Sequence, residues 1–235
     1  MTTAPPPSAA LAASRLVKTY GPSTALAGVD FRVDPGESVA IMGASGSGKT
    51  TLLHCLAGIV RPDSGSVMLA TAHGPLEVTA LDERGRSRLR RESFGFVFQQ
   101  GLLLPELTAV ENVALPLMLT GTDRRAAEQT AAMWLAALGL AGFEARRIGQ
   151  LSGGQAQRVA IARAQTTGAS VVFADEPTGA LDSATSAEVM DALIRSTTDR
   201  GRSLVVVTHD ESVAARCSRV LRLADGRIVD EVTAR

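Results

Sequence analysis

The chain has 235 residues, of which 45% are hydrophobic, so it can bury a sizeable core in one large domain or in a domain with an inserted lobe. Its 24 basic and 24 acidic residues balance, and no electrostatic footprint of a nucleic-acid-binding protein stands out. We therefore expect no nucleic-acid partner. The two cysteines, Cys55 and Cys217, have no metal-ligand spacing, and we expect both to be core residues in a reducing compartment.

Residues 1–13 are rich in proline and alanine and carry no positive charge, so they make a poor secretory signal. We expect a disordered tail over residues 1–13 and a single domain over residues 14–235. No stretch approaches the ~20 apolar residues that a membrane-spanning helix needs, because the best candidate, residues 102–119, is interrupted by proline and acidic residues. We expect a protein that is soluble by itself and reaches a membrane only through a partner.

Short β segments at residues 15–20 and 29–33, bounded by Gly-Pro and Pro-Gly turns, predict an antiparallel sheet near the N-terminus. A further short strand at residues 66–70 is expected to pair with one around residues 76–78. Tyr20, the only tyrosine, ends the first segment. It is either a half-buried strand aromatic or a stacking platform for a base.

An apolar run at residues 38–42 leads into a glycine-rich turn and then a helix. The turn has the spacing G-x-x-x-x-G-K-T, which lets successive backbone N–H groups point into one concavity at a positive helix end. The residues of this phosphate loop are Gly43, Ala44, Ser45, Gly46, Ser47, Gly48, Lys49 and Thr50. Lys49 would reach the outer phosphates of a nucleotide, and Thr50 would ligate Mg²⁺.

The middle of the chain changes from strand to helix. Residues 94–98 predict a buried strand that ends on Gln99, and the arginine-rich run before it, residues 84–91, is interpreted as the solvated face of a short helix. From Gly101 to about Gly149 the pattern is helical and alanine-rich, with no strand signal. We expect an inserted helical lobe over approximately residues 100–168, with Trp134 in its core.

A second anion-binding pattern follows at Ser152, Gly153, Gly154 and Gln155, where a hydroxyl and free N–H groups open another helix. Taken alone, the motif is better explained by Ser152 as an ordinary helix cap, with the glycines forming a tight turn.

Two carboxylates, Asp175 and Glu176, end an apolar strand at residues 171–174. Beside a phosphate loop, Asp175 can hold Mg²⁺ while Glu176 orients and deprotonates an attacking water. A last buried strand, residues 203–208, ends on His209, which is either structural or placed where α/β sheets bind ligands. The chain closes with a hairpin at residues 220–229, whose Asp-Gly loop predicts a type I′ turn.

Taken together, these motifs resemble the nucleotide-binding subunit of ATP-binding-cassette (ABC) transporters. In chain order they are the phosphate loop, Gln99, the pentapeptide Leu-Ser-Gly-Gly-Gln at residues 151–155, the Asp-Glu pair and His209. The resemblance covers about residues 14–230, and the pentapeptide is specific to that family. It implies an α/β fold: a P-loop NTPase core with a mostly parallel sheet, an N-terminal antiparallel β subdomain and an inserted helical lobe.

The resemblance also implies roles for individual residues, with ATP and Mg²⁺ as cofactors. Tyr20 looks like the adenine-stacking residue, and Gly43 to Thr51 match the phosphate loop. Gln99 matches a residue that senses Mg²⁺ and the attacking water, and Asp175 supports Mg²⁺. Glu176 corresponds to the catalytic base, and His209 to the γ-phosphate switch. Ser152 to Gln155 match the signature that closes on ATP bound to the other subunit, and Asp182 to a residue that communicates across the dimer.

These roles imply an ATP hydrolase that works as a head-to-tail homodimer or paired cassette and energises an integral membrane permease at the cytoplasmic face of the membrane. The motifs at residues 94–100, 111–117 and 175–182 look most like the lipoprotein-releasing and macrolide-exporting branch, which also contains the cell-division ATPase. The alternatives are the ATPase of a mechanical signalling complex without transport and a soluble non-transport ABC ATPase. The transported substrate and its direction are not readable from the residues.

Overall fold

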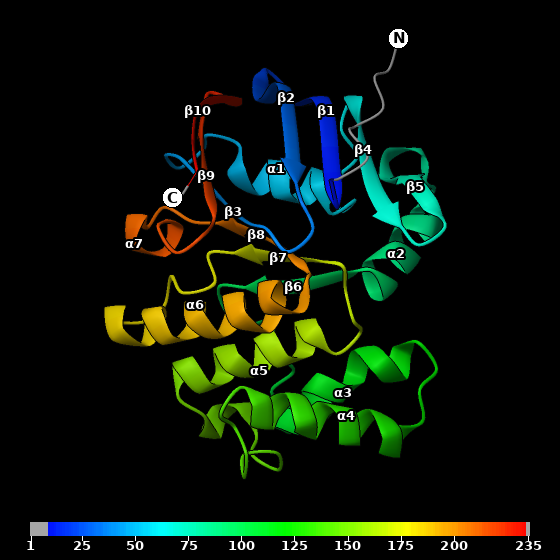
Figure 1. The fold of residues 1–235 in the computed structure, drawn as a ribbon, viewed down its shortest axis with the longest axis vertical. Coiled ribbons are helices and arrows are strands. Elements are labelled where there is room, and N and C mark those ends of the chain that lie inside the picture. Colours follow the sequence, from blue (N-terminus) through cyan, green and yellow to red (C-terminus); the bar gives the residue numbers. More distant parts are fainter. Residues whose placement is uncertain (1–8, 234–235) are drawn as a thin grey trace.

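The computed structural model describes residues 9–233 and contains two β-sheets with helices between them and on one side (Figure 1). The N-terminal sheet is antiparallel, with the strand order β2-β1-β4-β5. The second sheet has the order β10-β9-β3-β8-β7-β6, and all its neighbouring strands are parallel except β9 and β10. This is the expected α/β fold with an antiparallel subdomain ahead of a mostly parallel sheet.

The elements follow one another in the chain as β1 (Leu11–Tyr20), β2 (Ser23–Val33), β3 (Ser38–Met42), α1 (Lys49–Leu56), β4 (Ser64–Thr71), β5 (Gly74–Glu77), α2 (Glu83–Glu92), β6 (Phe94–Phe98), α3 (Ala109–Leu119), α4 (Arg124–Ala137), α5 (Gly153–Gln165), β7 (Val171–Asp175), α6 (Ser183–Thr197), β8 (Ser203–Val207), α7 (Glu211–Ala214), β9 (Arg219–Ala224) and β10 (Arg227–Thr233). Three short 3₁₀ turns, η1 (Val78–Ala80), η2 (Ile148–Gln150) and η3 (Thr198–Arg200), complete them.

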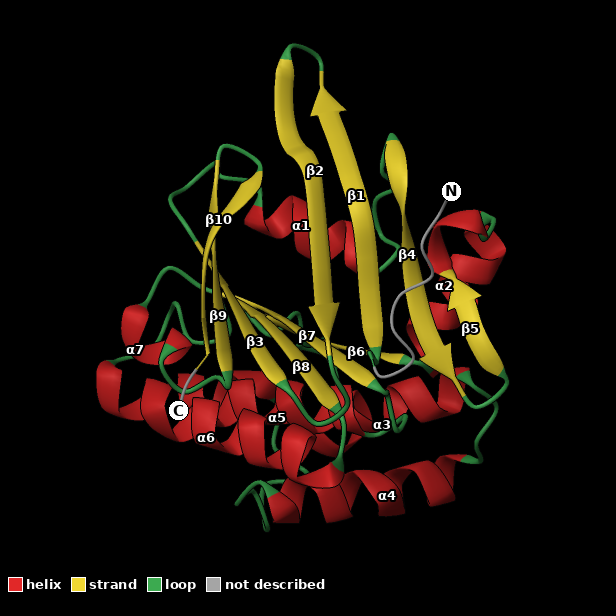
Figure 2. Ribbon diagram, turned by 45° about the horizontal axis from the view of Figure 1, so that its top comes forward, coloured by secondary structure: helices red, strands yellow, loops and turns green. Residues whose placement is uncertain are grey.

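The central strands are apolar on both faces because the parallel sheet is covered on both sides. Alternate residues along β3 separate into two clusters, since side chains of a strand point to opposite faces. Val39 and Ile41 pack with α1 and the antiparallel sheet. Ala40 and Met42 face the side of α3 to α6. Figure 2 shows the sheet between these two groups of elements.

The expected disordered tail is wrong at its C-terminal end. Strand β1 begins at Leu11, and residues 11–13 pair with both β2 and β4. Leu11 is fully buried in the hydrophobic cluster between the sheets, and Ala13 is buried there too. Burial of these two apolar side chains explains why residues 11–13 form part of a strand. The rest of the tail, residues 1–8, lies outside the described residues.

The segment between β6 and β7 contains α3, α4, η2 and α5, and within residues 9–233 no strand interrupts it. Asp123 caps α4, and Thr108 with Glu111 forms a capping box at the start of α3. Trp134 and Leu135 of α4 belong to the same hydrophobic cluster as α5, α6 and one face of the parallel sheet. The helices therefore share the core of the sheet.

The two hairpins expected from the sequence are both present. Strands β4 and β5 pair through a turn at Ala72 and His73, and β9 pairs with β10 across Asp225 and Gly226, both of which have positive φ.

Both cysteines are buried and unpaired, and burial raises the pKa of Cys55 to about 11 and that of Cys217 to about 12. Within residues 9–233, no helix combines the length and hydrophobicity needed to cross a membrane.

Candidate functional site

The phosphate loop connects β3 to α1 and is held by close backbone contacts at two of its glycines. A Cβ atom on Gly43 would lie 2.1 Å from the Leu223 carbonyl oxygen, and one on Gly48 would lie 2.2 Å from the Ala25 carbonyl oxygen. Both glycines also have positive φ, which residues with a side chain adopt only under strain. The loop therefore needs glycine at these positions to keep its shape.

The loop presents donors that suit a phosphate chain. Gly48 caps α1 without a side-chain hydrogen bond, so the first N–H groups of this helix face outward at its positive end. The Ser47 hydroxyl is buried and lacks a hydrogen-bond partner among the described residues. The Lys49 ammonium donates to the carbonyl oxygens of Gly43 and Ala44, both at 2.9 Å. These groups fit a bound polyphosphate, which would replace carbonyls as the partner of Lys49.

Asp175 lies beside this loop because β7 runs parallel to its neighbours, and its strand end meets theirs. The Thr50 hydroxyl is 3.5 Å from Asp175 Oδ1. Burial raises the pKa of Asp175, and the neighbouring Glu176 raises it further, whereas His54, Thr50 and Lys49 act in the opposite direction. A divalent cation here would favour the ionised carboxylate, and a hydroxyl with a carboxylate is a donor set that Mg²⁺ accepts.

Glu176 and His209 follow the ends of the adjacent strands β7 and β8. Their side chains share a hydrogen bond of 2.9 Å between His209 Nδ1 and Glu176 Oε1. Glu176 has φ of 47°, an uncommon value for a residue with a side chain, and its N–H donates to the Val207 carbonyl oxygen at 2.9 Å. The turn thereby aims the carboxylate at the phosphate loop.

A cavity of about 610 Å³ joins the phosphate loop to these two residues. It is lined by Ala25, Gly43, Ala44, Ser45, Gly46, Gly48, Lys49, Thr50, Thr51, Glu176 and His209. Its size is within the range of small-molecule sites. The structure therefore brings the predicted loop, base and strand-end histidine together around one space.

Gln99 follows β6, the edge strand next to β7, and its side chain turns toward the loop that follows β7. A Cβ atom on Gly179 would lie 2.9 Å from Gln99 Nε2. Gln99 is exposed and is not among the residues that line the cavity. It lies beside the loop that contains Glu176, where the chain leaves β6 toward α3 and α4.

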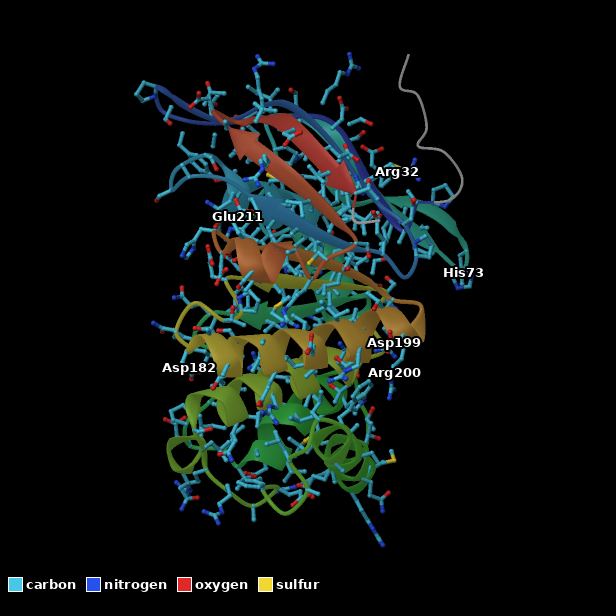
Figure 3. The ribbon with its side chains drawn as sticks, turned by 60° about the vertical axis from the view of Figure 1, so that its left-hand side comes forward. Arg32, His73, Asp182, Asp199, Arg200 and Glu211 are labelled. Atoms are coloured by element: carbon cyan, nitrogen blue, oxygen red, sulfur yellow. The ribbon has the colours of Figure 1, made fainter. Side chains whose placement is uncertain are left out.

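The predicted signature lies elsewhere in this chain. Ser152 caps α5 and accepts a hydrogen bond from the Gln155 N–H at 3.3 Å, while the Gln155 side chain accepts from the Ser152 N–H at 2.9 Å. Asp182 caps α6 by accepting hydrogen bonds from the N–H groups of Ala184 and Thr185, and the hydrogen bonds from Thr185 lower its pKa. None of Ser152, Gly153, Gly154, Gln155 and Asp182 lines the cavity. Figure 3 shows Asp182 at the start of α6, exposed at the side of the molecule.

Tyr20 lies at the end of β1 with 51% of its surface exposed, and the Lys18 ammonium is 5.4 Å from the centre of its ring. It does not line the cavity either. The sequence did not predict that Ala25 lines the cavity. It predicted the C-terminal hairpin but not its contact with the phosphate loop, in which the Gly226 N–H donates to the Ser47 carbonyl oxygen at 3.1 Å. No local signal marks either contact.

Comparison with known proteins shows to which family the chain belongs. The profile of the family described as ABC transporter matches residues 26–179. The lipoprotein-releasing system ATP-binding protein LolD of Hyphomonas neptunium (strain ATCC 15444) is 42% identical over 207 residues, which are 88% of this chain and 89% of that protein. The chain belongs to the ABC transporter family.

Other relatives agree with the ABC assignment. The macrolide export ATP-binding/permease protein MacB of Rhodopseudomonas palustris (strain HaA2) is 49% identical over 205 residues, 87% of this chain. The chain spans only 31% of the length of that MacB protein. A dimeric post-hydrolysis structure of the ATP-binding cassette MJ0796, bound to ADP and Pi, has a TM-score of 0.85 and 38% identity, covering 96% of this chain and 99% of that one. The chain thus has the fold of an ATP-binding cassette, and the proteins it is similar to include a macrolide-export protein and a lipoprotein-releasing protein, the branch expected from the sequence.

Proposed function

We propose that this ABC cassette binds ATP with Mg²⁺ in the cavity at the phosphate loop and hydrolyses it to power an integral membrane permease. The observation that carries the proposal is the convergence of Lys49, Glu176 and His209 on one cavity of about 610 Å³. Bound Mg²⁺ would supply charge neutralisation at the phosphates, with Thr50, Asp175 and Gln99 as the residues suited to hold it or its waters.

The chain's own residues account for the rest of the chemistry. The backbone N–H groups of the loop and the Lys49 ammonium hold the phosphates and stabilise the charge that develops on them. The Glu176 carboxylate orients a water for in-line attack and accepts its proton. His209 holds Glu176 through the hydrogen bond at Oε1, and this contact fixes the direction of the carboxylate.

The signature needs a second chain to act on this site. Ser152 to Gln155 open α5 and present a hydroxyl and helix N–H groups, yet they do not line the cavity of their own chain. In a head-to-tail homodimer, or in a pair with another cassette, the signature of one chain would close the nucleotide site of its partner, with Asp182 beside it. Tyr20 would then stack on the adenine from the exposed end of β1.

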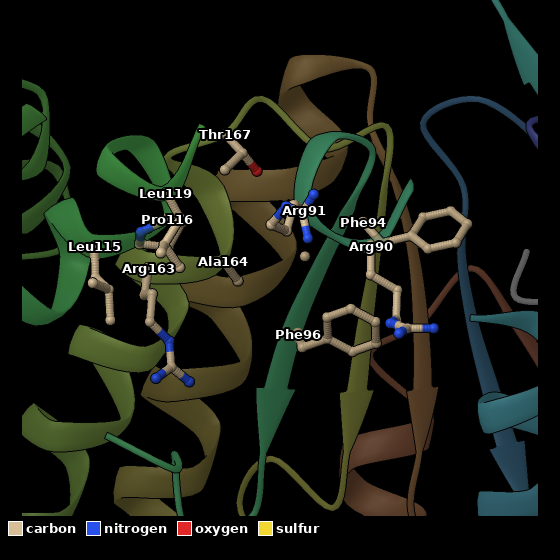
Figure 4. Close-up of a pocket in the computed structure, with 11 residues that line it drawn as sticks. Arg90, Arg91, Phe94, Phe96, Leu115, Pro116, Leu119, Arg163, Ala164 and Thr167 are labelled. Carbon is tan, nitrogen blue, oxygen red and sulfur yellow. The ribbon is translucent and has the colours of Figure 1, made fainter. Parts of the chain in front are cut away.

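For the permease, the structure offers an apolar groove beside β6. It has a volume of about 260 Å³ and is lined by β6 and by the C-terminal parts of α2, α3 and α5 (Figure 4). Leu115, Leu119 and Phe96 line it, and Leu119 is 64% exposed. A segment bound there would contact the strand that leads directly to Gln99. We propose that the cassette is a peripheral subunit at the cytoplasmic face of the membrane, since its relatives are named for macrolide export with a permease and for lipoprotein release.

Mixing two inactive variants tests the composite site. One variant carries Lys49→Ala, which disables the phosphate loop, and the other carries Gly153→Asp, which disables the signature. Each alone should hydrolyse no ATP. Their mixture should regain activity, because the heterodimer contains one intact loop facing one intact signature. Wild-type hydrolysis without any recovery in the mixture would contradict the head-to-tail arrangement.

A further inference from the structure

A second polar pocket lies where α4, α5 and α6 meet, away from the nucleotide cavity. It has a volume of about 500 Å³, and its lining shares no residue with that cavity. Trp134 and Leu138 form its apolar wall, and Arg158, Arg195 and Arg200 reach it from α5, from α6 and from η3. Figure 3 labels Arg200 at the far end of α6 from Asp182. No part of the proposed ATP chemistry uses this pocket.

The charges that line the pocket leave two arginines uncompensated. Two carboxylates also line it, but each belongs to an ion pair: Glu188 with Arg158 at 2.8 Å, and Asp191 with Arg216. Within residues 9–233, neither Arg195 nor Arg200 makes an ion pair. The pocket therefore carries an excess of positive charge on guanidinium groups, which bind carboxylates and phosphates in bidentate fashion.

Arg200 stacks on Trp134, and two further arginines beside the pocket are partly buried. The Arg200 guanidinium lies over the Trp134 ring, 4.2 Å from its centre, and Arg202 lies over the same ring at 5.8 Å. Burial lowers the pKa of Arg202, and the positive charge of Arg200 lowers it further. The Arg158 Nε atom is buried and has no hydrogen-bond partner among the described residues. A multivalent anion would relieve the repulsion among these groups.

We propose that this pocket binds a small multivalent anion bearing carboxylate or phosphate groups, paired by Arg195 and Arg200 beside Trp134. Its volume accommodates a molecule of the size of citrate or pyrophosphate. The site is independent of the nucleotide cavity, so the proposal does not depend on ATP hydrolysis.

Trp134 is the single tryptophan of the chain, so fluorescence excited selectively from tryptophan, without Tyr20, reports on the surroundings of this one side chain. The experiment titrates the full-length protein with citrate in one arm and with inorganic pyrophosphate in the other, at constant ionic strength, with acetate as the monovalent control. The pyrophosphate arm is repeated in Lys49→Ala, which removes the contribution of the phosphate loop. We expect a saturable change in emission with at least one multivalent anion and none with acetate.

The variant Arg195→Ala removes one cation without touching the Trp134 ring, and it should weaken binding by about tenfold or more. Arg84→Ala, an exposed arginine of α2, is the matched control and should leave the titration unchanged. Calorimetry with the same anion on Trp134→Phe checks the binding without the fluorophore. The proposal is overturned if neither anion gives a saturable signal, if acetate gives the same signal, or if Arg195→Ala binds as tightly as the wild type.

Discussion

Glu176 and His209 are separated by 33 residues in sequence and share a hydrogen bond of 2.9 Å at the ends of adjacent strands. The Glu176 side chain is only 21% exposed, whereas that of His209 is 71% exposed. The imidazole thus covers the carboxylate from the solvent side. This pairing leads to the first two predictions.

Replacing Glu176 with glutamine should reduce ATP hydrolysis by at least ~10²-fold, because the amide cannot accept the proton of the attacking water. Nucleotide binding should remain, so the variant should accumulate as an ATP-bound dimer. Phosphate release and size-exclusion chromatography with ATP measure the two effects. Glu106→Gln, an exposed residue before α3, is the control and should behave as the wild type. A monomeric Glu176→Gln protein beside an active wild type would refute the trapped-dimer expectation.

The effects of replacing Glu176 and His209 on the rate of ATP hydrolysis should not be additive. If His209 acts through Glu176, then Glu176→Gln combined with His209→Ala should hydrolyse ATP no more slowly than the slower single variant. The measurement is the steady-state rate for both single variants and the double variant. Losses that multiply would show that His209 acts independently of the carboxylate.

The Lys49 ammonium should change partners when a nucleotide binds, from the carbonyls of Gly43 and Ala44 to phosphate oxygens. Lys49→Ala should therefore weaken ATP binding by about ten- to a hundredfold, the effect expected for losing a charged hydrogen bond. Calorimetry measures the affinity, and thermal unfolding without nucleotide checks that the fold is intact. An unchanged affinity for ATP would show that Lys49 does not contact the bound nucleotide.

The start of α5 packs tightly on the start of α6. A Cβ atom on Gly154 would lie 2.5 Å from the Thr185 methyl group, while the Thr185 hydroxyl donates to Asp182 at 2.7 Å. Gly154→Ala should lower the free energy of unfolding by about 1–3 kcal/mol, as overpacking does. Adding Thr185→Ser removes the methyl group and keeps the hydroxyl, so it should restore most of the loss. Gly149→Ala, where a Cβ atom meets nothing, is the control.

The lowered pKa of Asp63 predicts that the free energy of unfolding depends on pH. A hydrogen bond from Lys18, followed by bonds from Thr19, lowers its pKa from 3.8 to about 2. Because the folded-state pKa lies below the unfolded one, Asp63 stabilises the fold fully above pH 4, and this contribution disappears as the pH falls toward 2. Asp63→Asn should melt earlier than the wild type at pH 7, and the difference should close near pH 2. A difference in melting temperature that stayed the same from pH 7 to pH 2 would contradict this role of Asp63.

Much of the site was predictable because its motifs encode local backbone geometry. The spacing of Gly43, Gly48 and Lys49 determines a loop that opens a helix, and the apolar run ahead of Asp175 determines a central strand. Parallel strands then bring their ends to one edge, which is how Thr50 comes within 3.5 Å of Asp175.

What local patterns could not predict are contacts set by packing across the chain. Nothing around Ala25 or Leu223 marks them as the backbone that seats the phosphate loop. The burial of Leu11 in the core between the sheets depends on β4, which lies far along the chain, so its segment was predicted as tail. The stacking of Arg200 on Trp134 likewise joins two helical regions that carry no shared motif.

The contact between Gly43 and the Leu223 carbonyl has a consequence for how the protein is made. The phosphate loop is synthesised well before β9, the strand whose backbone seats it. A nascent chain halted before β9 holds the complete loop sequence without the backbone that shapes it. The loop can therefore take its final shape only after β9 has been made and has paired with β3.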